Sequence, residues 1–429
     1  MRHTISVLPG FVSILTCCGG RSGIDASDLN VGGTISHTSM AATGGGRSTG
    51  GMKSAGGKSG TAESGSGGLA NSKSVARSIS AGSRYSCAVL SNGTLVCWGR
   101  NDFGQLGNDV TMQSGVPVAV TGITNAVFVA ANTGTGALYE HTCAIQSGGT
   151  LTCWGGNLHG ELGDGMTADS VLPVAVKGVT SASAVATGNG FTCASLEDGT
   201  VQCWGYNIAG QLGDGTTAPH SVSVTVGGIS GAVAIAAGDE HSCAVLSDGT
   251  IRCWGTNFHG ELGSLPASES HVPIAVTGIT SAVAVGAAYH HTCALLGDGT
   301  VQCWGRNDNG QLGNGTTAQS SVPVTVKTIS NAVGIAVGVN HCCASLGDGT
   351  VRCWGYNVDG ELGDGTNIDS RAPVVVIGVS QAASVAAGYV HTCAMLRDGR
   401  VQCWGYNGDG ELGNGTNTDS LVPIGVSGF

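Results

Sequence analysis

The stretch HTCALLGDGTVQCWGRNDNGQLGNGT, from His291 to Thr316, holds two cysteines ten positions apart, an Asp-Gly turn between them and a Trp-Gly pair directly after the second cysteine. The Cys-Trp-Gly triplet occurs seven times in the 429 residues, with its cysteine at positions 97, 153, 203, 253, 303, 353 and 403. The first step is 56 residues and the other five are 50. A period in this range is typical of solenoids and propellers. We therefore expect seven copies of one supersecondary unit.

Each unit contains four short runs with strand character. In the fifth unit they are AVAVGA (Ala282 to Ala287), HTCALL (His291 to Leu296), TVQCWG (Thr300 to Gly305) and VPVTV (Val322 to Val326). Gly, Asp-Gly and Asn-Gly clusters separate them, and such residues form turns because glycine reaches positive φ without steric cost. Four strands in about 50 residues match a propeller blade. The fold class that we predict is all-β, a seven-bladed β-propeller with four strands per blade.

The phase of the repeat suggests how the ring closes. The first unit begins near Val75 and, counted from there, lacks a preceding Pro-Val strand, whereas VPIGV at Val422 to Val426 is left over at the end. We expect this C-terminal strand to complete the first blade and close the ring. The Ala/Val/Gly strand of each unit should be innermost, since strands that converge on an axis need small side chains. A β-solenoid is the alternative, but its rungs are usually shorter.

The unit, with the pattern G-x-x-H-T-C-A-L-x-x-D-G-T-V-x-C-W-G-x-N-x-x-G-Q-L-G-x-G-T, resembles the repeat of the regulator of chromosome condensation family, a seven-bladed propeller. The resemblance covers residues 75–429. The paired cysteines depart from the eukaryotic nuclear repeat and look like the secreted bacterial branch of the superfamily. The resemblance implies interaction functions: nucleotide exchange on a small GTPase and chromatin binding in the nuclear member, and β-lactamase inhibition in a secreted bacterial one.

The spacing of the paired cysteines predicts disulfides. With a three-residue loop at Gly297-Asp298-Gly299, Cys293 lies directly opposite Cys303, and cross-strand neighbours have Cβ atoms about 4.5–5.5 Å apart. Zinc would need four ligands, and although a histidine precedes most pairs by two residues, seven identical zinc sites are not expected. Redox catalysis would use an exposed Cys-x-x-Cys, which the sequence lacks. The seven predicted bridges are Cys87–Cys97, Cys143–Cys153, Cys193–Cys203, Cys243–Cys253, Cys293–Cys303, Cys343–Cys353 and Cys393–Cys403.

The N-terminal part has a different composition. Residues 1–18 read as a signal peptide or lipoprotein signal, with Cys17 and Cys18 as candidate lipidation sites. Residues 19–74 are rich in Gly, Ser, Thr and Ala without periodicity, which predicts a disordered tether. Residues 75–429 then form the propeller. An export signal together with seven cysteine pairs predicts an extracytoplasmic protein, secreted or held on the outer surface of a bacterium as a lipoprotein.

Several repeat positions carry chemistry-bearing residues, and each has a structural interpretation beside the functional one. The recurring histidine, at 141, 241, 291, 341 and 391, gives way to Tyr85 and Phe191, which favours packing or hydrogen bonding over a ligand role. The tryptophans are expected between blades, with the indole N–H satisfied locally. Loops such as the one from Asn357 to Asp369 are expected to be structural turns, although calcium binding remains open. Cys342 is left over and is expected to be a buried free thiol.

The function that we predict is a non-enzymatic module that binds another, unidentified protein through its loops. The chain is acidic, with a net charge of -11, and is a poor candidate for nucleic acid. No catalytic or phosphate-loop motif is visible, and we expect no cofactor, no metal and a monomer. The alternatives are a guanine-nucleotide-exchange-like regulator, implied by the resemblance, and a carbohydrate-binding or hydrolytic propeller. Candidate partner contacts are chosen where the repeat is irregular, at Asn132, Leu138, Tyr139, Glu140, Phe258 and His259.

Overall fold

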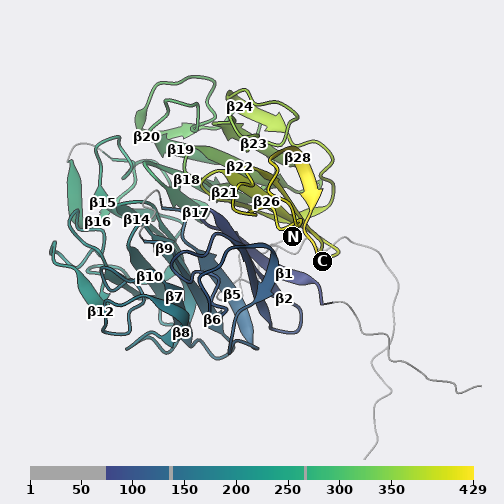
Figure 1. The fold of residues 1–429 in the computed structure, drawn as a ribbon. Coiled ribbons are helices and arrows are strands. Elements are labelled where there is room, and N and C mark those ends of the chain that lie inside the picture. Colours follow the sequence, from purple (N-terminus) through teal and green to yellow (C-terminus); the bar gives the residue numbers. More distant parts are fainter. Residues whose placement is uncertain (1–73, 135–138, 265–267) are drawn as a thin grey trace, which may run out of the picture. The chain divides into compact units, whose positions relative to one another are not determined.

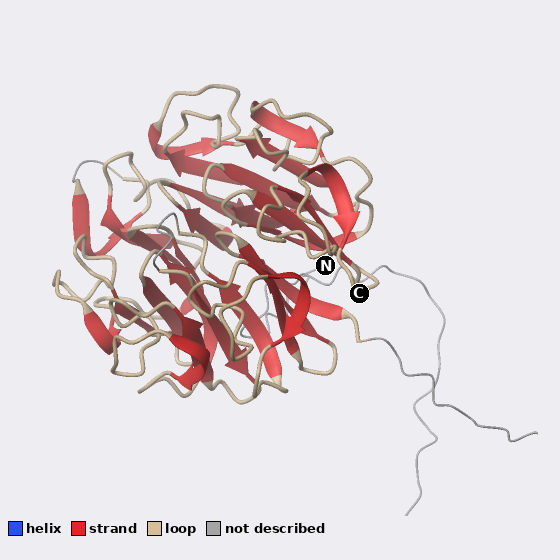
Figure 2. Cartoon of the chain, viewed as in Figure 1, coloured by secondary structure: helices blue, strands red, loops and turns tan. Residues whose placement is uncertain are grey.

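The computed structural model describes residues 74–134, 139–264 and 268–429. In this part of the chain, 28 strands form seven separate four-stranded antiparallel sheets that follow one another around a ring (Figures 1 and 2). The predicted all-β seven-bladed propeller is confirmed. Nothing within the described ranges is a helix long and apolar enough to cross a membrane. The predicted signal, tether and lipidation sites lie outside the described residues.

The four strands of each blade occupy equivalent places. The first strands are β1 (Ala76–Ala81), β5 (Ala126–Ala131), β9 (Ala182–Gly188), β13 (Ala232–Ala237), β17 (Ala282–Ala288), β21 (Ala332–Val337) and β25 (Ala382–Ala387). The second strands are β2 (Tyr85–Leu90), β6 (His141–Gln146), β10 (Phe191–Leu196), β14 (His241–Leu246), β18 (His291–Leu296), β22 (His341–Leu346) and β26 (His391–Leu396). The third strands are β3 (Leu95–Gly99), β7 (Leu151–Gly155), β11 (Val201–Gly205), β15 (Ile251–Thr256), β19 (Val301–Gly305), β23 (Val351–Gly355) and β27 (Val401–Gly405). The fourth strands are β4 (Ser114–Ala119), β8 (Ser170–Ala175), β12 (His220–Thr225), β16 (Glu269–Ala275), β20 (Ser320–Thr325), β24 (Ser370–Val375) and β28 (Ser420–Gly425).

The first strands line the centre of the ring, as their small residues predict. A cavity of about 290 Å³ is lined by residues of six of these strands, among them Val185, Ile235, Val285, Ile335 and Val385. The remaining lining side chains are mostly alanine, valine and glycine, with Phe128 as the one aromatic among the lining residues. Small side chains therefore let the strands approach the axis.

The hairpin between the second and third strands has the predicted register. Cys293 pairs with Cys303, and the turn is closed by hydrogen bonds from Leu296 N–H to Thr300 O (2.9 Å) and from Gly299 N–H to Leu296 O (3.0 Å). Gly299 takes a φ of +81°, which a residue with a Cβ rarely adopts. Each of the seven predicted cysteine pairs forms a disulfide across the equivalent hairpin, with Cα atoms 4.0–4.1 Å apart.

The predicted closure by the C-terminal strand is wrong. Strand β28 pairs with β27 in the seventh blade, and the first blade has a Pro-Val strand of its own, β4, in which Val118 pairs with Cys97. The Pro-Val strand belongs to the blade of the Cys-Trp-Gly strand that precedes it, because its hydrogen bonds go to that strand. The first and seventh blades instead meet side by side. Gly415 N–H is bonded to Gly115 O at 2.8 Å, and Phe429 lies against the ring of Trp98.

The tryptophans bind each blade to the one before it. Every indole Nε1–H donates to the backbone carbonyl of the Gln or Glu in the Gly-[Gln/Glu]-Leu-Gly loop of the preceding blade, at 2.7–2.9 Å. Trp254, for example, is fully buried and donates to Gln211 O. The interblade position was predicted, but the partner is not local: it lies 43 residues away in five of the seven cases.

The recurring histidines form a second interblade link. His241 Nε2 lies 2.9 Å from the hydroxyl of Thr292 in the next blade, and that hydroxyl also donates to Glu261 O at 3.0 Å. Burial lowers the pKa of His241 and of His341 to about 4, so both are neutral near pH 7. These side chains are buried and hydrogen-bonded, in agreement with the structural interpretation from the sequence.

Candidate functional site

One face of the ring carries the irregular parts of the repeat. In each blade the first and third strands end there and the second and fourth strands begin there, so two connections per blade share that face. We call it the loop face. It consists of the described residues of loops 100–113, 156–169, 206–219, 257–264 with 268, 306–319, 356–369 and 406–419, and of turns 82–84, 132–134 with 139–140, 189–190, 238–240, 289–290, 338–340 and 388–390.

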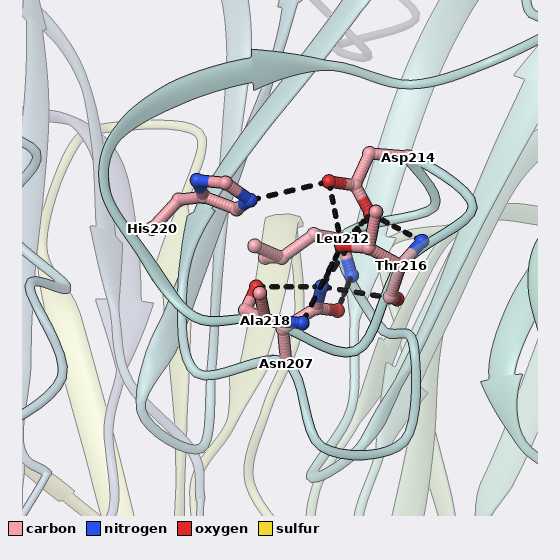
Figure 3. Close-up of polar contacts among 6 residues, drawn as sticks. All are labelled: Asn207, Leu212, Asp214, Thr216, Ala218 and His220. Atoms are coloured by element: carbon pink, nitrogen blue, oxygen red, sulfur yellow. Dashed lines mark hydrogen bonds and ion pairs between the residues drawn. The ribbon is translucent and has the colours of Figure 1, made fainter.

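The long loops are held by their own asparagine. In the third blade, shown in Figure 3, Asn207 Oδ1 accepts from Leu212 N–H at 3.0 Å and its Nδ2 donates to Thr216 O and Ala218 O at 3.2 and 2.9 Å. Asp214 accepts from Thr216 N–H at 2.9 Å and lies 3.3 Å from His220 Nε2. The motif therefore forms a turn that is held by its own hydrogen bonds.

The loop with the strongest resemblance to a calcium site uses its acids in the same way. Asn357 Oδ1 accepts from Leu362 N–H at 2.8 Å, and Asp369 Oδ1 accepts from Asn357 N–H at 2.9 Å. Asp364 Oδ1 accepts from Thr366 N–H at 3.0 Å. One oxygen of each of these three side chains is therefore engaged with the loop backbone, as the structural interpretation predicts.

Beneath the loop face lies a ring of buried carboxyl and carboxamide side chains, which the sequence reading did not single out. These are Gln105, Glu161, Gln211, Glu261, Gln311, Glu361 and Glu411, all with no exposed surface. One oxygen accepts the N–H of the residue two positions earlier, as from His159 to Glu161 at 2.8 Å and from Asp359 to Glu361 at 3.0 Å. Among the described residues, the other oxygen of Glu161, Glu361 and Glu411 has no hydrogen-bond partner.

Burial makes Glu161, Glu361 and Glu411 weaker acids than an exposed glutamate. It raises the pKa of Glu161 to about 7 and the pKa of Glu361 and Glu411 to about 8, because the charged form is poorly solvated there. Glu140 belongs to the same layer: its carboxylate accepts a hydrogen bond from Gln105 and lies 3.4 Å from Arg100, yet burial still raises its pKa to about 7. Near neutral pH this layer is partly protonated.

Above this layer, apolar tips project into solvent at the position after the loop asparagine. Leu158, Ile208 and Phe258 are 54%, 57% and 69% exposed in three consecutive blades, and Val358 occupies the same position in the sixth blade. Exposed apolar side chains that gather at equivalent places on one face are typical of interaction surfaces.

Aromatic and imidazole rings accompany these tips. Tyr139, His159 and Tyr206 form a stack across blades 2 and 3, with centroids 5.2 and 4.5 Å apart. Between blades 4 and 5, His290 packs against His259 at 4.9 Å and against its neighbour Tyr289. Aromatic residues are enriched at protein interfaces.

The candidate contact residues differ in their exposure to solvent. Phe258 is exposed, and His259 and Tyr139 are half-buried on the loop face. Asn132 and Glu140 are not available as contacts, because both are buried: Asn132 bonds to Gly188 O and Gly134 N–H, and Glu140 joins the buried layer. The ends of the insertion are thus tied into the fold. Leu138 lies outside the described residues.

Cys342 is a buried free thiol, as expected. Its Sγ lies 3.1 Å from His291 Nε2 and 3.5 Å from Gln311 O, so the thiol takes the place of the hydroxyl found in other blades. Burial raises the pKa of this thiol well above its ordinary value.

The central cavity does not resemble a hydrolytic centre. A glycosidase would place two carboxylates about 5–10 Å apart in the mouth of the ring. Within the described ranges, the side chains that line the cavity are apolar apart from Ser345 and Ser384, and none is a carboxylate. The hydrolytic alternative therefore gains no support from this cavity.

Comparison with known families agrees with this geometry. A model of the RCC1-like domain matches residues 184–428, and models of the regulator of chromosome condensation (RCC1) repeat match residues 76–105 and 92–145. The chain belongs to the RCC1-like domain family. Its match to this family spans the blades that carry Phe258, His259 and His290.

Individual relatives of this RCC1-like propeller match over short segments. The Protein RCC2 homolog of Danio rerio is 38% identical over 91 residues, which are 21% of this chain and 18% of the relative. The ultraviolet-B receptor UVR8 of Arabidopsis thaliana is 33% identical over 100 residues, 23% of this chain and 22% of the relative. The chain thus spans about a fifth of the length of these curated relatives.

The structure of yeast RCC1 (Prp20) bound to Kap60 has the same fold. It aligns with a TM-score of 0.68 and 20% identity, covering 83% of this chain and 85% of that chain. At this identity the likeness concerns the fold alone.

Proposed function

We propose that this RCC1-like propeller is a non-enzymatic module that binds a protein partner through its loop face, outside the cytoplasm. The observation that carries the proposal is the row of exposed tips at Leu158, Ile208 and Phe258. They recur at one loop position, directly after the asparagine that holds the loop, in three consecutive blades.

The hydrogen bonds within the long loops support this use of the face. The loop backbones are fixed by Asn207 and its equivalents, so the tips are presented on a rigid base and little ordering entropy is lost on binding. A yeast protein of the same fold has been solved in complex with Kap60, so this fold can bind a protein partner. The partner of the present chain is not implied by that complex.

The cysteine pairs support the extracytoplasmic setting. Seven disulfides form and persist in oxidising compartments and are rare in the cytosol. Fractionation of cells that express the full chain, with Cys17→Ser and Cys18→Ser variants labelled with a radioactive fatty acid, tests the setting and the anchor. Recovery of the intact chain in the cytoplasm with free thiols would contradict it.

A retention assay tests the binding face. The full chain is immobilised and compared with the triple variant Leu158→Asp, Ile208→Asp, Phe258→Asp. The matched control is Val222→Asp, Val272→Asp, Val322→Asp, which changes exposed valines on the outer strands β12, β16 and β20. We expect a partner that the wild type and the control retain and the loop variant loses. Equal retention by the loop variant would refute the assigned face.

A further inference from the structure

Between blades 4 and 5 the loop face holds a group of three side chains that the repeat does not require. His259 and Glu261 come from loop 257–268 of blade 4, and His290 comes from turn 289–290 of blade 5. One potential ligand atom from each lies within 4.8 Å of the other two, and His290 Nδ1 is 3.1 Å from Glu261 Oε1. From this geometry we propose a binding site for a divalent transition metal of the zinc type, with three protein ligands and an open fourth position.

The ligand set suits such a metal. Zinc binds imidazole nitrogen and carboxylate oxygen at about 2.0–2.2 Å, and catalytic or exchangeable sites use three protein ligands. Tetrahedral bonds of that length place ligand atoms about 3.3 Å apart. The pair formed by His290 and Glu261 already has that spacing. His259 is half-buried, and closing its gap of at most about 1.5 Å needs only a side-chain rotation.

The surroundings hold the ligands in place. Glu261 is fully buried, and its Oε2 accepts from His259 N–H at 2.8 Å, which directs Oε1 toward His290. His259 Nδ1 lies 3.3 Å from Gln319 Oε1, the kind of outer acceptor that orients a metal-bound imidazole. The fourth position would take a water or a side chain of a partner, next to the exposed Phe258.

The same loop elsewhere in the ring shows that the third ligand is particular to this place. The sequence His-Gly-Glu occurs also at His159 to Glu161, but the turn that faces it carries Gly190 where blade 5 has His290. His159 stacks there between two tyrosines. Blade 2 is therefore an internal control with two of the three ligands.

Calorimetric titration of the untagged full chain with ZnCl2 tests the proposal. We expect one equivalent of zinc, a rise in the thermal unfolding midpoint on addition of zinc, and a loss of affinity of about 100-fold or more in His290→Gln, since even outer-shell changes cost about 10–100-fold. His290 is partly buried in a turn of the loop face and Gln can replace it without a change of charge at neutral imidazole, so this variant should fold. His159→Gln should bind like the wild type. The absence of zinc binding by the wild type, or equal binding by His290→Gln, would overturn the proposal.

A second variant tests whether the geometry is sufficient. In blades 6 and 7 Glu361 is the equivalent of Glu261, and Asp359 and Val390 occupy the positions of the two histidines. Asp359→His combined with Val390→His should create a second equivalent of zinc binding. A folded variant that still binds a single equivalent would contradict the assignment by geometry.

Discussion

The indole Nε1–H of Trp98 donates a 2.8 Å hydrogen bond to the backbone carbonyl of Glu411, 313 residues further along the chain. This bond joins the first blade to the last, and Phe429 packs on the same indole with ring centroids 6.0 Å apart. The ring is therefore closed by the link that also joins every other pair of neighbouring blades, and no strand is exchanged.

The closing tryptophan should matter more than an internal one. In Trp98→Phe the Glu411 carbonyl keeps only the Ser86 hydroxyl, at 3.4 Å, whereas in Trp254→Phe the Gln211 carbonyl keeps Ser242 at 3.0 Å. We expect Trp98→Phe to lower the free energy of unfolding by about 2–4 kcal/mol and Trp254→Phe by less. Urea unfolding measures both, and an equal loss would show that the closing bond contributes no more than an internal one.

Replacement of Cys342 should separate its hydrogen-bonding role from its thiol chemistry. Cys342→Thr restores the hydroxyl of the other blades between His291 Nε2 and Gln311 O, so the thermal midpoint should stay the same or rise. Cys342→Ala leaves the buried imidazole without this partner and should cost about 1–3 kcal/mol. A threonine variant less stable than the alanine variant would refute this role.

The stability of the propeller should be highest near pH 6.5. Burial lowers the pKa of His141, His241 and His341 to about 4 and of His291 and His391 to about 3. Below pH about 6.5 the unfolded chain binds protons at these histidines while the folded chain does not, so acid destabilises the fold.

The glutamates act in the opposite direction. Above pH about 4.5 the unfolded chain loses their protons, whereas the folded chain keeps them up to pH about 7 at Glu140 and Glu161 and about 8 at Glu361 and Glu411. Between pH 4.5 and 6.5 the effects of the histidines and of the glutamates on the free energy of unfolding largely cancel. From pH 6.5 to 8 only the glutamates remain, so the unfolding midpoint should fall.

A double variant isolates this effect. Glu361→Gln with Glu411→Gln places at both sites the residue that blades 1, 3 and 5 already carry. Each substitution should reduce the loss of unfolding free energy between pH 6.5 and 8 by roughly 1–2 kcal/mol. Thermal scans at both pH values check it, and an unchanged slope would exclude these carboxyl groups as its source.

A single disulfide should stabilise the propeller measurably. Cys243 and Cys253 close a short hairpin, and their joint replacement by alanine should lower the free energy of unfolding by about 2–3 kcal/mol by the loop-entropy model. Alkylation of the wild type without reduction, as it is recovered from the cells that produce it, followed by mass spectrometry, should modify none of the fourteen paired cysteines. Seven modified pairs would show that the bridges do not form in the cell.

The local features of the fold could be predicted because they repeat. The position of Cys303 relative to Cys293 specifies the loop length and therefore the hairpin register. The small residues of β17 (Ala282–Ala288) indicate the axis. The phase of the ring was mispredicted because a cyclic repeat can be divided before or after the Pro-Val strand, and only hydrogen bonding to the preceding strand decides between them.

The candidate site was harder to predict, since it depends on contacts between blades. Phe258 was found from its departure from the repeat, but Asn132 was chosen from an insertion whose end proved to be buried. Glu261 looked like a turn residue, because nothing in one unit shows that its carboxyl is buried under the next blade. The doublet His290-His291, where every other unit has at most one histidine, was the available signal for the metal-type group.

Site-specific photo-crosslinking tests the central claim most directly. A photoreactive residue is introduced at Phe258 on the loop face or at Val272 on β16 of the same blade, both of them exposed, and the full chain is irradiated in the cells that produce it. The account predicts a discrete adduct with one protein from position 258 and none from position 272. Adducts from position 272 alone, or from neither position, would contradict a partner-binding loop face.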